Sequence, residues 1–301
     1  MNTNWKDAWT LMRIPFSLFL MPIFWLALSM LPLESWDPVK AVLVFLHLHL
    51  LVYPASNGYN SLIDQDETSI GGLENPPKVN VQLKMLVLVF EFLALSLGFI
   101  LGLEFGFCVA VYWLMSRAYS GPAIRLKRFP ILSWLTVVLF QGAWTVLMVW
   151  AGIVTNGIIF ETGYLWIWPV VASIFLMGSY PVTQIYQHTA DSKRGDRTLS
   201  FILGIRGTLL FALAGLLAGS SILILGLWLT HDLNGLPVII ISSSPSFIYF
   251  AIWMRKVWKD PSLADYRHTM LFNRISSISL SIGFLGHLVL KFFGISILLH
   301  P

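Results

Sequence analysis

Long apolar runs alternate with polar segments along the whole chain of 301 residues. A transmembrane helix needs about 20 mostly apolar residues, and nine runs approach or exceed that length. The pattern therefore predicts an all-α, polytopic membrane protein of about nine transmembrane helices. The runs are Leu11–Leu31, Val39–Ser56, Met85–Leu103, Phe105–Arg117, Ile131–Ile153, Tyr164–Ile185, Gly207–Thr230, Leu236–Met254 and Ile275–Leu299.

The polar segments between these runs are alternately long and short, and the long ones hold most of the basic residues. Basic residues concentrate in the cytoplasmic loops of membrane proteins. We therefore expect the N-terminus and the long segments to be cytoplasmic and the C-terminus to lie outside, as an odd number of spans requires. The long segments lie near Gly58–Lys84, Ala118–Pro130, Tyr186–Arg206 and Arg255–Arg274.

The composition supports a chain dissolved mostly in lipid. Only 11% of the residues are charged and 56% are hydrophobic, whereas soluble domains carry about 25% charged residues. The single cysteine, Cys108, excludes an intramolecular disulfide and a cysteine-rich zinc site. The net charge of +4 reflects loop orientation, and we expect no nucleic acid partner. Without a separate soluble segment, residues 1–301 are predicted to form one transmembrane domain.

An internal repeat carries the candidate chemistry. Each copy begins with Tyr-Pro at the predicted cytoplasmic end of a span and then places an amide, an amide and a carboxylate at positions i, i+3 and i+7. On a helix this spacing puts the three side chains on one face. The copies are Tyr53-Pro54-x-x-Asn57-x-Tyr59-Asn60-x-x-x-Asp64 and Tyr180-Pro181-x-x-Gln184-x-Tyr186-Gln187-x-x-x-Asp191.

Two such rows have the chemistry of a magnesium site. Mg²⁺ prefers oxygen ligands and often takes one or two carboxylates plus water and substrate phosphates. Solvated helix ends would explain one row alone. Two rows of matching spacing favour function, because polar residues at membrane depth are costly and tend to mark sites. Facing each other, the rows would hold metal ions that bridge to one diphosphate.

Charged residues near the rows extend this hypothesis. Two acids follow the first row, and basic residues follow the second row or occupy the segment between the fourth and fifth runs. Basic side chains beside a metal site can neutralise a phosphate leaving group, although each of them would also serve membrane topology alone. These residues are Asp66, Glu67, Lys78, Arg125, Lys127, Lys193 and Arg194.

Three segments together resemble the UbiA superfamily of intramembrane prenyltransferases. Asn60 and Asp64 resemble the Asn/Asp-x-x-x-Asp motif of that family. The segment from Asp191 to Leu199, with Leu203-Gly204 after it, resembles the second Asp-rich loop. Tyr119-Ser120, Pro122 and Arg125-Leu126-Lys127 resemble the loop after the fourth helix. The resemblance covers nearly the whole chain.

The resemblance implies a Mg²⁺-dependent transfer of a prenyl group from a polyprenyl diphosphate to an aromatic or lipid-like acceptor within the bilayer. Asn60, Asp64 and Asp191 are the implied catalytic residues. The implied metal ligands are these three, assisted by Asn57, Asp66, Glu67 and Gln187. The implied diphosphate-binding residues are Lys193, Arg194, Arg125, Lys127 and Lys78.

The sequence departs from the family pattern at two positions. Gln187 stands where the second motif usually has its first Asp, and Thr68 stands where the first motif usually has a further acid. Fewer carboxylates weaken Mg²⁺ binding or change its geometry. The departures indicate a divergent member acting on an unusual lipid. The alternative is a catalytically altered transporter or lipid-binding protein on the same helices.

Overall fold

The computed structural model describes residues 4–155 and 163–297, apart from the side chains of Lys193 and Arg194. Within these ranges the chain is helical, and its β-structure is limited to two isolated bridges. The helices are α1 (Trp5–Leu11), α2 (Ile14–Ser17), α3 (Met21–Ser29), α4 (Pro38–His47), the π-helical turn η3 (Leu48–Val52), α5 (Tyr53–Asp64), α6 (Val81–Leu101), α7 (Leu103–Ser120), α8 (Pro130–Val137), the π-helical turn η5 (Val138–Ala143), α9 (Trp144–Ile153), α10 (Ile167–Val182), α11 (His188–Arg194), α12 (Leu199–Leu229), α13 (Leu236–Lys259) and α14 (Tyr266–Phe293).

Eight helical segments in the described part of the chain are long and apolar enough to cross a membrane. The helix α7 covers the remaining predicted run, Phe105–Arg117, but its 18 residues, which include Glu104 and Arg117, are not apolar enough for it to be one of these eight. At 1.5 Å per residue it is about 27 Å long, close to the thickness of the hydrocarbon core. The eight segments are Trp5–Ser29, Pro38–Asp64, Val81–Leu101, Pro130–Ile153, Gly163–Val182, Leu199–Leu229, Leu233–Lys259 and Tyr266–Phe293.

The outer surface of this bundle is apolar, as a lipid-facing surface must be. Ile100, Ile241 and Phe292 each expose 71–76% of their surface. Large exposed apolar areas are unfavourable in water but not in hydrocarbon. The chain is therefore an integral, multi-pass membrane protein, as the sequence predicted.

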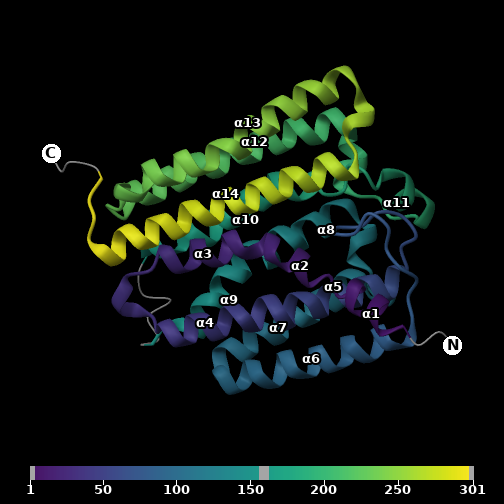
Figure 1. Ribbon diagram of the computed structural model, residues 1–301, viewed down its shortest axis with the longest axis horizontal. Coiled ribbons are helices and arrows are strands. Elements are labelled where there is room, and N and C mark those ends of the chain that lie inside the picture. The colour runs from purple at the N-terminus through teal and green to yellow at the C-terminus, as the bar shows by residue number, and fades with distance from the viewer. Residues whose placement is uncertain (1–3, 156–162, 298–301) are drawn as a thin grey trace.

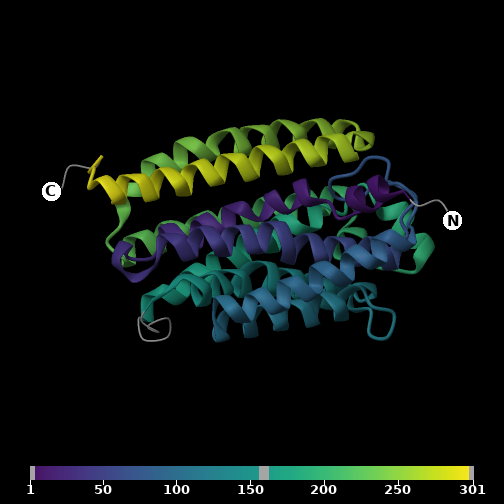
Figure 2. The same cartoon turned by 60° about the horizontal axis from the view of Figure 1, so that its bottom comes forward.

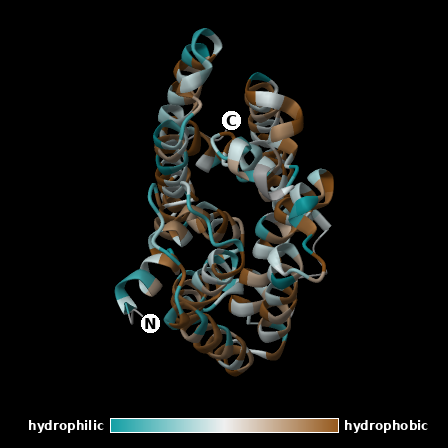
Figure 3. Ribbon diagram, turned by 90° about the vertical axis from the view of Figure 1, so that its right-hand side faces the viewer, coloured by the Kyte–Doolittle hydropathy of each residue, from teal (hydrophilic) through white to brown (hydrophobic). Residues whose placement is uncertain are grey.

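The spanning helices lie side by side and roughly along one direction (Figure 1). The segment between α5 and α6 and the short helix α11 lie at the same end as the N-terminus, and the C-terminus lies at the opposite end (Figures 1 and 2). Seen from the N-terminal end, the hydrophilic loops stand out against the more apolar helices (Figure 3). Two segments that the sequence placed on one side of the membrane therefore share one end of the bundle.

Small residues and tryptophan anchors fix the helix packing around the site. A Cβ added to Gly178 of α10 would lie 2.9 Å from the Cα of Gly215 in α12, so these backbones pack at a distance that a side chain would prevent. The buried Trp150 of α9 donates its indole N–H to the Ala27 carbonyl of α3 at 2.8 Å. These contacts join helices that are distant in the sequence.

The first predicted span is not one continuous helix. Arg13 adopts a left-handed conformation (φ 51°), which separates α1 from α2. Pro15 and Pro22 follow, and each lacks the N–H that a continuous helix needs. The apolar run Leu11–Leu31 therefore holds the end of α1, the helix α2, a 3₁₀ turn and α3.

The polar segment predicted at Arg255–Arg274 is mostly helical. The helix α13 continues to Lys259, and α14 begins at Tyr266. Asp265 caps α14 by accepting a hydrogen bond from the backbone N–H of His268 at 2.8 Å, which stabilises this polar first turn. The predicted end of the last span, Leu299, lies outside the described residues.

Candidate active site

The first polar row lies on one helix, as predicted. Asn57, Asn60 and Asp64 belong to α5, which follows the π-helical turn η3 and has Pro54 in its first turn, where proline is tolerated. All three line one large cavity. Asn60 donates through Nδ2 to Asp64 Oδ2 at 2.7 Å and to Ser120 Oγ at 3.0 Å. The Asn60 amide therefore orients the Asp64 carboxylate.

The second row lies on a broken helix, which corrects the expectation of one helical face. The helix α10 ends at Val182, and tight turns join it to α11, which carries Asp191. The Gln184 N–H, for example, donates to the Pro181 carbonyl at 3.1 Å, an i to i−3 bond. The physical reason is the position of the proline: Pro181 lies inside α10, where it lacks a backbone donor and α10 ends one residue later, whereas Pro54 lies in the first turn of α5.

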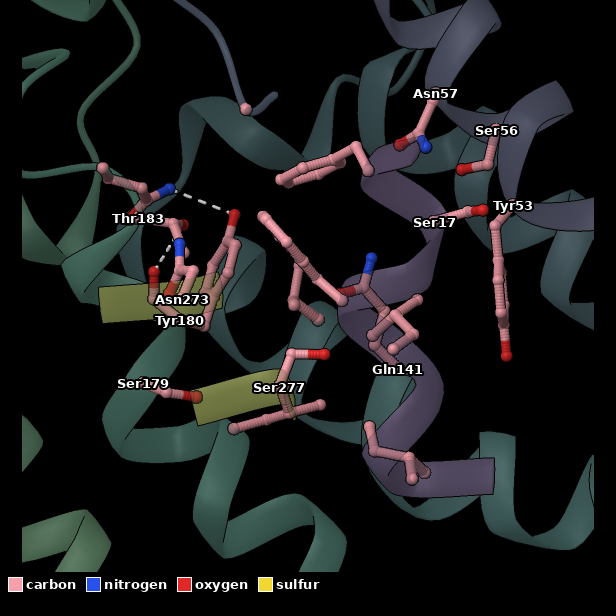
Figure 4. Close-up of a pocket in the computed structure, with 18 of the residues that line it drawn as sticks. Ser17, Tyr53, Ser56, Asn57, Gln141, Ser179, Tyr180, Thr183, Asn273 and Ser277 are labelled. Atoms are coloured by element: carbon pink, nitrogen blue, oxygen red, sulfur yellow. Dashed lines mark hydrogen bonds between the residues drawn. The ribbon is translucent and has the colours of Figure 1, made fainter. Parts of the chain in front are cut away.

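Despite this break, the two rows meet at the same cavity, of about 370 Å³. From the second row, Gln184, Gln187 and Asp191 line it together with all three residues of the first row. Gln187 also donates to the Ser69 carbonyl at 3.1 Å and so ties the second row to the segment after the first. In Figure 4, Asn57 of α5 and Thr183, in the turn after α10, project toward the same cavity.

Basic residues pair with the carboxylates at the polar end of the cavity. Lys127 forms an ion pair with Asp64, and Arg125 lies 3.5 Å from the same carboxylate. Arg125 also donates to both oxygens of Asp196, at 3.2 and 2.9 Å. Lys127 and Asp196 are buried. This cluster places positive charge beside both acidic motifs, where an incoming anion would compete with the carboxylates for it.

The remaining predicted residues differ in their distance from the cavity. Asp66 lines it, whereas Glu67 and Lys78 are exposed and do not. Thr68 is also exposed. Lys193 and Arg194 belong to α11, but their side chains lie outside the described part of the structure.

Arg13 is a cavity residue that the sequence analysis did not single out. Its guanidinium is buried and donates to the Asn57 carbonyl at 2.8 Å, to the Gly71 carbonyl at 3.3 Å and to Asn60 Oδ1 at 3.3 Å. An arginine followed by Ile-Pro in an apolar run was the available signal, because a charge at membrane depth marks a function or a partner. Asp196 was missed as well, although it lies in the motif that contains Asp191.

Away from the charged end, apolar side chains form much of the cavity wall. They come from helices as distant in the sequence as α2, α10 and α14. A wall of this kind suits a hydrocarbon chain, because it removes apolar surface from water. The residues include Phe16, Phe19, Leu20, Ile23, Leu26, Phe140, Phe175, Leu176, Leu280 and Phe284.

Two ionisable residues beside the second row are held neutral. Burial raises the pKa of the Tyr186 phenol well above its usual range. Burial lowers the pKa of His188, whose Nε2 lies 2.8 Å from Ser200 Oγ. Neither side chain therefore adds charge at neutral pH, and the charge of the site rests on its Asp, Lys and Arg residues.

The oxygen donors of the cavity suit Mg²⁺ that is shared with a phosphate. Asp64, Asp66 and Asp191 offer carboxylates, and Asn57 and Gln187 offer amide oxygens. The described residues include no group of three acidic, histidine or cysteine residues close enough to hold a metal by themselves. This donor set fits an ion that completes its coordination with water and substrate phosphate oxygens.

Fold and site together define an intramembrane protein whose polar, charged pocket opens into an apolar cavity. A family comparison narrows this class: the model of the UbiA prenyltransferase family matches residues 19–275, and the chain belongs to that family. Family membership supports prenyl transfer in the membrane as the general activity.

Solved structures show the same fold at low sequence identity. A UbiA homolog from Archaeoglobus fulgidus, bound to DMAPP and Mg²⁺, has a TM-score of 0.65 and 16% identity, over 93% of this chain and 98% of that one. The same homolog bound to GPP and Mg²⁺ has a TM-score of 0.62 and 17% identity, with the same coverage. A digeranylgeranylglyceryl phosphate synthase has a TM-score of 0.60 and 17% identity, over 94% of this chain and 98% of that one. No curated protein matches the chain.

Proposed function

We propose that this protein transfers a prenyl group from a polyprenyl diphosphate to an aromatic or lipid-like acceptor in the membrane, in a Mg²⁺-dependent reaction. One observation carries the proposal: both acidic motifs line one cavity whose charged end holds Lys127 and whose remainder is largely apolar. The relatives bound to DMAPP or GPP with Mg²⁺ support the same substrate class.

In this proposal Asp64 and Asp191 are the principal metal ligands and the catalytic residues, together with Asn60. Asn57, Asp66 and Gln187 assist from the cavity wall, and Glu67 would approach only from the exposed loop. Bound Mg²⁺ supplies positive charge that stabilises the departing diphosphate. The Asn60 side-chain oxygen accepts a hydrogen bond from Arg13 in this structure. The Asn60 side-chain N–H therefore acts by orienting Asp64.

The basic residues hold the diphosphate. Lys127 and Arg125 already lie beside Asp64, so they would exchange carboxylate contacts for diphosphate oxygens. Lys193, Arg194 and Lys78 would complete the anion site from α11 and from the exposed loop.

The reaction breaks the bond between C1 of the prenyl chain and the diphosphate oxygen, and the electron pair leaves with the diphosphate. The acceptor then forms a bond to C1 and loses a proton. The apolar wall holds the hydrocarbon chain and excludes water, which would otherwise capture the allylic cation.

The test is pyrophosphate release from geranylgeranyl diphosphate by the purified protein in lipid, with and without Mg²⁺. We expect Mg²⁺-dependent release that Asp64→Asn and Asp191→Asn reduce by at least two orders of magnitude, because each removes a charged ligand. Thr136→Val is the matched control, since the Thr136 hydroxyl already donates to the Leu132 carbonyl at 2.7 Å. Absence of release with donors of several lengths and a panel of acceptors would favour transport or lipid binding instead.

A further inference from the structure

A polar group lies in the cavity within the membrane-spanning region and has no part in the reaction described above. Gln141 lines the cavity from the span Pro130–Ile153, and Tyr112 and Ser56 line it beside Gln141. Ser56 Oγ is hydrogen-bonded to Ser116 Oγ at 2.6 Å, and Gln141 and Tyr112 line the cavity beside it. Figure 4 shows the Gln141 amide projecting into the cavity.

The backbone around Gln141 is arranged to present it. Gln141 belongs to the π-helical turn η5, and such turns leave backbone groups without their regular partners. Ser173 of α10 is the partner of two backbone groups in this turn. Its Oγ donates to the Val138 carbonyl and accepts from the Ala143 N–H, each at 3.0 Å. Gly142 permits this approach, because a Cβ there would lie 2.7 Å from the Ser173 Cα. The neighbouring helix therefore fixes the turn that directs Gln141 inward.

This group lies deeper in the bundle than the charged end. Gln141 is eleven residues beyond Pro130, where its span begins, which corresponds to about 16 Å along a helix. Among the described lining residues, the Lys and Arg side chains are Arg13 and Lys127. Arg13 is bonded to the polar rows and Lys127 to Asp64, so both belong to the charged end. The deeper group is polar but uncharged.

A prenyl chain alone does not explain the Gln141 side chain, because hydrocarbon would leave its amide without a hydrogen-bonding partner, which is unfavourable. An acceptor that attacks C1 from the side opposite the departing diphosphate would enter from beneath the charged end, where this group lies. An uncharged group favours a neutral ligand, because a buried carboxylate requires a positive partner.

We propose that Gln141, with Tyr112 and Ser56, forms a binding subsite for a hydroxyl or carbonyl oxygen of a neutral acceptor. The inference rests on the proposed prenyl transfer and narrows its acceptor to neutral, oxygen-bearing molecules.

The experiment measures binding by isothermal titration calorimetry to the full chain in nanodiscs, without a prenyl donor. The probes are 2-naphthol, naphthalene, which lacks the oxygen, and 6-hydroxy-2-naphthoate, which adds a carboxylate. We expect 2-naphthol to bind about tenfold more tightly than either of the other two. Gln141→Met, which keeps the side-chain length, should weaken 2-naphthol binding about three- to tenfold and leave naphthalene binding unchanged. Thr136→Val, on the same span, should alter neither.

Equal binding of 2-naphthol by wild type and Gln141→Met would overturn the proposal, as would equal binding of naphthalene and 2-naphthol or a preference for the carboxylate. Gln141→Leu repeats the test with a second apolar side chain, and the melting temperature of each variant identifies a folding defect. Pyrophosphate release by the wild type is measured separately. A failure of prenyl transfer is therefore distinguished from a failure of this subsite.

Discussion

Arg13 joins three parts of the site through one side chain, and this depends on the shape of the guanidinium. Its nitrogens reach the Asn57 and Gly71 carbonyls and the Asn60 amide oxygen. A lysine ammonium keeps the charge but concentrates its donors on one atom, so it cannot reproduce this set. We expect Arg13→Lys to raise the KM for the prenyl diphosphate three- to tenfold in the pyrophosphate-release assay.

Arg128→Lys is the control for this substitution, because Arg128 is exposed at the same end of the molecule. A KM for Arg13→Lys equal to that of wild type would show that charge alone suffices at this position. The segment around Gly71 would then be held by its other contacts.

Buried Asp196 is expected to hold Arg125 in position, because its two carboxylate oxygens each accept a hydrogen bond from the Arg125 guanidinium. Asparagine at this position removes the charge and one acceptor, so Asp196→Asn should lower the stability of the protein by about 1–3 kcal/mol. The measurement is the melting temperature in detergent. Glu67→Gln changes an exposed acid in the same region and should leave the melting temperature unchanged. A similar decrease for both variants would contradict the special role of Asp196.

The sequence predicted most of the residues at the charged end but not those that depend on a local backbone change. The repeat spacing predicted that the rows containing Asp64 and Asp191 belong together, and both line the cavity. Arg13 and Gln141 were missed because each reaches the cavity through an irregular turn within an apolar run. Hydrophobic periodicity gives the length of a span and does not reveal such a turn.

Within the helices, the backbone conformation also restricts which residues are tolerated, and α12 gives the clearest example. Gly204 interrupts this helix with φ 65° and ψ 175°, a conformation that is essentially restricted to glycine. A Cβ there would meet no atom within 4 Å, so the cost of Gly204→Ala is backbone strain alone. We expect the substitution to destabilise the protein by about 1–3 kcal/mol, seen as a lower melting temperature.

Gly207→Ala provides the comparison on the same helix. This glycine has no unusual backbone conformation, and the nearest atom to an added Cβ is the Leu203 side chain at 3.3 Å. Alanine favours a helix over glycine by up to about 1 kcal/mol, so Gly207→Ala should be neutral or stabilising. Equal melting temperatures for Gly204→Ala and Gly207→Ala would show that alanine adopts the backbone conformation at Gly204 without strain.

Element boundaries were predicted well where the apolar runs end at turns and poorly where polar residues continue a helix. The helix α14 begins at Tyr266, nine residues before the predicted start at Ile275, because Asp265 caps it outside the apolar core. Helical hydrogen bonds do not stop where the hydrocarbon does. The second copy of the repeat shows the reverse case, since α10 ends one residue after Pro181, whereas the first copy remains helical through Asp64.

For the whole molecule, the distribution of charge over the two ends decides how the site is oriented in the cell. Lys291 lies inside the last predicted run, but its positive charge is paired within the protein. Its ammonium lies 3.2 Å from Asp232 and donates to the Ser29 and Leu31 carbonyls at 3.0 and 3.1 Å. The end opposite the site therefore has little unpaired positive charge, which strengthens the contrast with the basic end.

This contrast predicts that the site faces the cytoplasm, and single-cysteine labelling checks it. In a Cys108→Ser background, Thr68→Cys would report the exposed loop beside the site, and Glu34→Cys would report the exposed turn before α4. A membrane-impermeant maleimide should label Glu34→Cys in intact cells and Thr68→Cys only after the cells are opened, because the basic end remains inside during insertion. Pyrophosphate release by each variant confirms its fold. Labelling of Thr68→Cys in intact cells would reverse the orientation, and the prenyl diphosphate would then have to reach the site from outside the cell.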